Sequence, residues 1–144
     1  SENWINQRLK SIEIRKELTD EWKNRGLKEG IQFATLTDII TKAWSDKSTK
    51  EYKVFKGLKK ENLRDNMTNT ELILNMLAEA STKDISQATN PNDFEESKKV
   101  AKQGGNVAKV ALKELESKTG KKVVSPLNAK SVLGIDKPKK KKEE

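Results

Sequence analysis

Basic and aromatic side chains alternate along residues 51–64, in a pattern that could contact a nucleic acid. Lysine and arginine neutralise phosphates, asparagine can hydrogen-bond a base or a phosphate, and a turn at Gly57 would let the backbone come near a ligand. This interpretation predicts a binding site formed by Tyr52, Lys53, Lys56, Lys59, Lys60, Asn62 and Arg64. The alternative is a short helical hairpin whose aromatic side chains belong to the core and whose lysines are only solvated.

A second basic element lies near the C-terminus, where Lys139, Lys140 and Lys141 form part of a lysine run. Each phosphate that such an arm neutralises releases counterions, so the run would raise non-specific DNA affinity. Lysine runs that end in acidic residues, as this one does at Glu143, can also act only in solubility. The composition predicts a disordered tail.

The sequence contains no cysteine and no histidine. Their absence excludes thiolate nucleophiles, imidazole bases, thiolate zinc sites and disulfides. The acidic side chains of Asp84, Asp93, Glu95 and Glu96 have no recognised metal-ligand spacing, and carboxylates favour helix N-termini for dipole reasons alone. No phosphate-binding loop, dinucleotide fingerprint or nucleophile elbow is present. We therefore expect a protein that is not an enzyme and has no metal or cofactor.

Apolar residues recur at helical spacing through most of the chain, which predicts a mainly α bundle of five to seven helices. Ser/Thr-x-x-Asp/Glu capping boxes at 35–38, 48–51, 68–71 and 81–84 are expected to begin helices, and the most hydrophobic one, after Thr68, should be central. A first helix ends at Asn24 before Gly26. Its apolar residues fall on two nearly opposite faces, Ile5, Leu9 and Ile12 on one and Ile14, Leu18 and Trp22 on the other.

A long helix is predicted between Asp93 and Lys118, with two glycines inside it. Small residues recur along one side of this helix, at Ala101, Gly104, Ala108 and Ala111. Another backbone could approach such a stripe closely, which would suit a homo-oligomer interface. A kink at the glycines is the competing interpretation.

The length of 144 residues fits one folding unit with a small core. We expect a connector or helix start over 1–14, a helical domain over 15–125 with a short extended piece at 121–125, and a flexible basic tail over 126–144. No apolar run is long enough to span a bilayer and the N-terminus does not read as a signal peptide, so we expect no membrane contact and a cytoplasmic protein.

The net charge of +8 is unevenly distributed. Residues 1–66 carry 15 Lys/Arg against 11 Asp/Glu, residues 67–97 carry 1 against 6, and residues 98–144 carry 14 against 5. Two basic flanks therefore surround an acidic middle. Such a surface attracts polyanions, so nucleic acid is the leading partner class and acidic proteins are the second.

Several runs also resemble a known family, at 15–26, 52–65, 67–74, 77–81, 104–105 and 113–125. They resemble the C-terminal half of the bacterial DNA-damage-inducible protein D family, whose N-terminal half is similar to BRO-type phage antirepressors. That half is missing here, which suggests an excised C-terminal domain.

The resemblance implies an SOS-response setting and action on DNA or on recombination and repair proteins. It supplies no catalytic residues. We therefore expect a non-catalytic regulatory domain that binds DNA through its basic surfaces. The alternative is a protein-interaction or oligomerisation module that acts on recombination or repair proteins.

Overall fold

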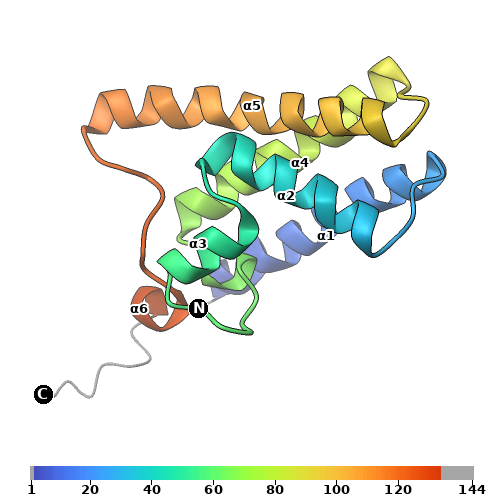
Figure 1. Cartoon of the computed structure of the whole chain (residues 1–144). Helices are drawn as coiled ribbons and strands as arrows, with labels where there is room; N and C mark the ends of the chain where they lie inside the picture. The colour runs from blue at the N-terminus through green and yellow to red at the C-terminus, as the bar shows by residue number, and fades with distance from the viewer. Residues whose placement is uncertain (1, 134–144) are drawn as a thin grey trace, which may run out of the picture.

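The computed structural model describes residues 2–133, and within this range the chain is helical and has no strand. The helices are α1 (Glu2–Asn24), α2 (Ile31–Ser45), α3 (Thr49–Phe55), the 3-10 turn η1 (Arg64–Asn66), α4 (Asn69–Thr89), α5 (Phe94–Thr119) and α6 (Ala129–Leu133) (Figure 1). The mainly α fold class is confirmed. The lysines predicted to contact DNA at 139–141 lie outside the described residues.

The helix α4 is central, as its hydrophobic sequence predicted, because it packs against α1, α2 and α5. The helix α5 also lies along α2, so α2, α4 and α5 pack against one another, and α1 packs against α4 (Figure 1). Apolar side chains from all four helices fill the core, including Leu18, Trp22, Leu36, Ile40, Trp44, Leu72, Ala108 and Leu112. On α1 it is the face with Leu18 and Trp22 that is buried, whereas Ile5, Leu9 and Ile12 are exposed.

Two of the predicted capping boxes are formed and two are not. Ser48 and Thr68 each accept a hydrogen bond from the backbone three residues on, and the Glu side chain there bonds back. In contrast, α2 already begins at Ile31, and the Thr35 hydroxyl donates to the Ile31 carbonyl inside the helix at 2.8 Å.

The second incorrect start, at 81–84, lies in the middle of α4. Thr82 is fully buried there, and its hydroxyl donates to the Ala78 carbonyl at 2.8 Å. Packing against α5 keeps this turn helical and outweighs the local capping preference. The helix α4 therefore continues to Thr89, where Asn90 ends it in a left-handed conformation.

The small-residue stripe of α5 is used inside the domain, which corrects its assignment to an oligomer interface. Ala101, Gly104 and Ala108 are buried, and Ala111 packs against the core. A Cβ added to Gly104 would lie 2.7 Å from the Thr82 Cα, so α4 approaches at this point. The close-approaching backbone was predicted, but it belongs to the same chain. No kink is needed, because α5 is unbroken through both glycines.

Both ends of the described chain belong to the folded domain. Residues 2–14 are part of α1 itself, and the buried Arg8 guanidinium donates to the Met67 carbonyl at 2.6 Å. Residues 121–125 are irregular and form no strand. The tail predicted from 126 onward is ordered as far as Leu133, since Asn128 donates to the Lys56 carbonyl at 3.1 Å and Asn66 accepts from the Ala129 amide at 2.8 Å.

Candidate nucleic-acid interface

Two of the residues predicted to bind nucleic acid are buried in the protein. Tyr52 has no exposed surface and donates its hydroxyl hydrogen to Glu71. Lys56 is 2% exposed, and its Nζ lies 2.7 Å from Glu71 Oε1. Lys56 directly follows α3 and lies four positions after Tyr52, so both side chains point to the core on the same side. Neither can contact a nucleic acid, and this corrects the predicted role of both.

The Glu71 carboxylate instead joins three parts of the chain. Besides Tyr52 and Lys56, it accepts from the Thr68 amide at 2.8 Å and from the Ser125 amide at 2.9 Å. Lys56 completes this clamp by donating to the carbonyls of Ser125 and Leu127. The clamp therefore holds the segment after α5 onto α3 and α4.

Burial changes the acid–base properties of the clamp. It lowers the pKa of Lys56, against the opposing effect of Glu71. Burial, together with the neighbouring Glu71 charge, raises the pKa of Tyr52 well above its usual range. This arrangement could not be predicted from the sequence, because the capping box already explained Glu71.

Arg64 also has an internal partner. Its Nη2 lies 2.7 Å from Glu79 Oε2, and Nη1 of Arg15 lies 3.2 Å from the same oxygen. The Glu79 side chain is 1% exposed, so two guanidinium groups share one buried carboxylate. Burial, together with the neighbouring Arg64 charge, lowers the pKa of Arg15 against the opposing effect of Glu79. These three side chains carry a net positive charge of one.

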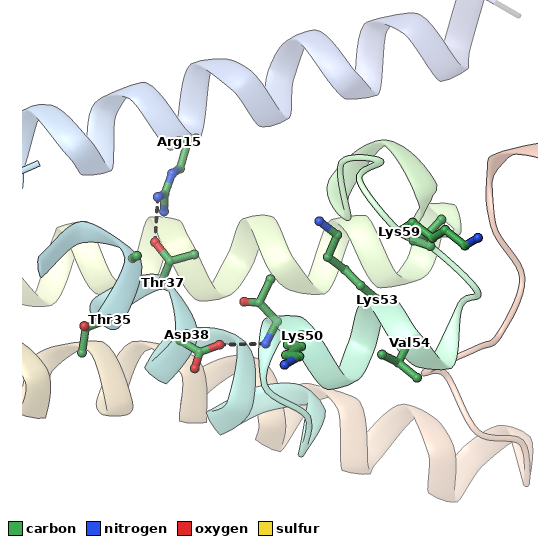
Figure 2. Close-up of a pocket in the computed structure, with 11 residues that line it drawn as sticks. Arg15, Thr35, Thr37, Asp38, Lys50, Lys53, Val54 and Lys59 are labelled. Carbon is green, nitrogen blue, oxygen red and sulfur yellow. Dashed lines mark hydrogen bonds between the residues drawn. The ribbon is translucent and has the colours of Figure 1, made fainter. Parts of the chain in front are cut away.

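Arg15 lies at the edge of a groove of about 760 Å³ between α1, α2, α3 and the loop after α3. Four basic residues and one acidic residue line the groove. The full lining is Arg15, Ala34, Thr35, Thr37, Asp38, Thr49, Lys50, Lys53, Val54, Leu58 and Lys59. Figure 2 shows Arg15 extending from α1 toward Thr37 of α2, with Lys53 on α3 and Lys59 on the following loop. The groove thus contains two of the predicted residues, Lys53 and Lys59.

Some charged side chains of the groove are held by hydrogen bonds within the protein, and others have no ion-pair partner within residues 2–133. Arg15 is held by the Thr37 hydroxyl, to which its Nη2 donates at 2.6 Å. The Asp38 carboxylate accepts from the Thr49 amide at 2.7 Å (Figure 2). Lys50, Lys53 and Lys59 form no ion pair with any described residue, and Lys50 and Lys59 are exposed. Three ammonium groups are therefore available to an anion in the groove.

The remaining predicted residues lie beside the groove. Lys60 and Asn62 are exposed on the loop after α3 but do not line it. The Asn62 side chain accepts from the Asp65 amide at 3.2 Å, as turn-forming asparagines do. Sequence reasoning missed Arg15 and Lys50. Arg15 is distant in sequence, and only the tertiary fold, in which α1 packs on α4 and Arg15 reaches Thr37 of α2, brings it to the other basic residues.

No described helix is long and apolar enough to cross a membrane. Over residues 2–133, the acidic residues form no group of three or more that could hold a metal ion. Comparison with protein-family models, with curated proteins and with solved structures found no match. The resemblance to the damage-inducible protein D family stays a prediction.

Proposed function

We propose that this protein is a non-catalytic domain that binds nucleic acid, DNA in the first place, through the basic groove between α1, α2 and α3. The observation that supports the proposal best is the set of three lysines around the groove, Lys50, Lys53 and Lys59, which have no carboxylate partner among the described residues. The choice of DNA, and of a bacterial damage response as the setting, follows from the family resemblance.

The charge on the groove wall supports the same proposal. Arg15, which lines the groove, shares the single carboxylate of Glu79 with Arg64, so this cluster at the edge of the groove carries a net positive charge. The Asp38 carboxylate is already hydrogen-bonded to the start of α3. An incoming phosphate would therefore meet several cations and one partly satisfied acidic group, and the Coulomb attraction would exceed the repulsion.

The salt dependence of binding tests the proposal quantitatively. Three lysines that each neutralise one phosphate give a slope of log K against log salt of about −2.7, and therefore a loss of about 40-fold between roughly 50 and 200 mM salt. The triple variant K50E/K53E/K59E should remove this contribution. Fluorescence anisotropy with labelled DNA measures the salt slope of the wild type and of the variant. The difference between the two slopes gives the contribution of the groove lysines, separate from that of other basic segments.

A matched control is available on and just after α5. The triple variant K99E/K118E/K121E changes the net charge by the same amount, at exposed lysines that do not line the groove. Circular dichroism should show that both variants keep their helices. Equal loss of DNA binding in the two triple variants would refute the groove, since only total charge would then matter.

A further inference from the structure

The aromatic side chains of this protein are placed where a nucleic-acid base cannot stack in the groove. All seven aromatic residues of the chain lie within the described range. Four of them, Trp22, Phe33, Trp44 and Tyr52, are buried in the core. None of the seven lines the groove.

The other three rings each have a cation of the same chain over the ring. Arg8 lies 4.5 Å from the centroid of Trp4, Lys47 lies 4.4 Å from that of Phe55, and Lys98 lies 4.9 Å from that of Phe94. Phe55, at 40% exposure, borders a different hollow, beside Leu112 and Val124. Proteins that hold single strands use open aromatic faces on which successive bases stack, and such a platform is not formed here.

The groove instead offers groups that suit phosphates. Its basic residues supply ammonium and guanidinium donors, and Thr49 supplies a hydroxyl group, whereas the hydroxyls of Thr35 and Thr37 already donate to carbonyls within α2. No asparagine or glutamine side chain, which would read adenine, lines it. Contacts of this kind fix a backbone in place and carry no sequence information.

We infer that the groove receives the sugar–phosphate backbone of double-stranded DNA, without reading its sequence and without stacking the bases of a single strand. This inference rests on the proposed function. Duplex DNA presents one charge per about 1.7 Å of axis, so each neutralised phosphate releases more counterions than in a single strand. With three phosphates, the slopes of about −0.9 and −0.7 per phosphate differ by about 0.6 in total. For forms that bind equally at about 1 M salt, this difference favours the duplex about sixfold near 50 mM salt.

The test is a titration of labelled DNA of about 20 nucleotides with increasing concentrations of the protein, near 50 mM salt. The probes are two duplexes of unrelated sequence and one of their strands alone. We expect equal Kd values for the two duplexes, a Kd about sixfold higher for the single strand, and loss of duplex binding in K50E/K53E/K59E but not in K99E/K118E/K121E. The variant Phe55→Ala should bind every probe as the wild type does.

The outcomes separate this inference from the function on which it rests. A single strand that binds as tightly as the duplexes, and that the groove variant releases, would overturn the duplex preference and leave nucleic-acid binding intact. Loss of single-strand binding in Phe55→Ala would likewise show a stacking site that the inference denies. No binding to any probe would refute the proposed function itself.

Discussion

The substitution Gly104→Ala would place a methyl group where α5 crosses α4. The new Cβ would lie 2.7 Å from both the Cα and the backbone nitrogen of Thr82, and it would also collide with the Thr82 hydroxyl. Rotation of the Thr82 side chain cannot relieve contacts with the backbone of α4. The two helices would have to separate, and the small-residue packing around Ala101 and Ala108 would loosen.

The expected cost combines two opposing effects. Alanine gains about 1 kcal/mol over glycine inside a helix. Overpacking of a tight interface costs about 1–3 kcal/mol, and backbone contacts this short place the cost near the upper limit. The free energy of unfolding should therefore fall by about 2 kcal/mol. For a domain of this size, with roughly 4 °C of Tm per kcal/mol, Tm should fall by about 8 °C.

Urea and thermal unfolding followed by circular dichroism measure this loss. The control is Asn106→Ala at an exposed position of α5, where better helix propensity should raise stability by a few tenths of a kcal/mol. Sedimentation should give the same oligomeric state for the wild type and for Gly104→Ala. A gain of about 1 kcal/mol in Gly104→Ala, as for an exposed helix glycine, would refute the close approach of α4 and α5.

The remaining predictions concern the buried clamp and the groove. Lys56→Ala leaves the Glu71 charge buried without its cation, so it should cost about 3–5 kcal/mol and should speed amide exchange over 125–133; a variant of unchanged stability would contradict the clamp. The pKa of Tyr52 is raised in the fold, so the neutral hydroxyl contributes fully to the free energy of unfolding below about pH 10. Above that pH this contribution is lost, and the free energy of unfolding falls by up to about 1.4 kcal/mol per pH unit. The lowered pKa of Lys56 acts in the opposite direction, because it adds stability as the pH rises toward the pKa of a free lysine. The test is therefore Tyr52→Phe, whose free energy of unfolding should fall less steeply above about pH 10 than that of the wild type. For the groove, K50E/K53E/K59E should flatten the salt dependence of DNA binding by about 2.7 in slope, and the duplex should bind more tightly than its single strand.

Much of the fold followed from local patterns. The helix starts at Ser48 and Thr68 and the stop at Asn24 before Gly26 depend on short-range hydrogen bonds and backbone conformation, and these were correctly predicted. The starts predicted at 35 and 81 were wrong because packing decided them. Thr82 is buried against Gly104, and α2 begins a full turn earlier than its capping pattern indicated.

The candidate site could be predicted only in part. Alternation of lysine and aromatic residues drew attention to α3 and the loop after it, which line part of the groove, but it did not separate the inward face from the outward one. Tyr52 and Lys56 point to Glu71, and Lys53 and Lys59 point to the groove. The difference depends on how α3 is rotated against α4, which residues 51–64 do not encode.

Three features follow from the sequence alone: the helical class, two of the capping boxes and the lack of cysteine and histidine chemistry. Each depends on residue identity or on neighbours within one turn. Which charges are free depends on how the helices pack. Glu71 pairs with Lys56, and Glu79 pairs with both Arg64 and Arg15, whereas no described carboxylate pairs with Lys53 or Lys59. The sequence specifies which residues are charged. Whether a charge is available to a partner depends on burial and ion pairing, which arise only when the helices pack.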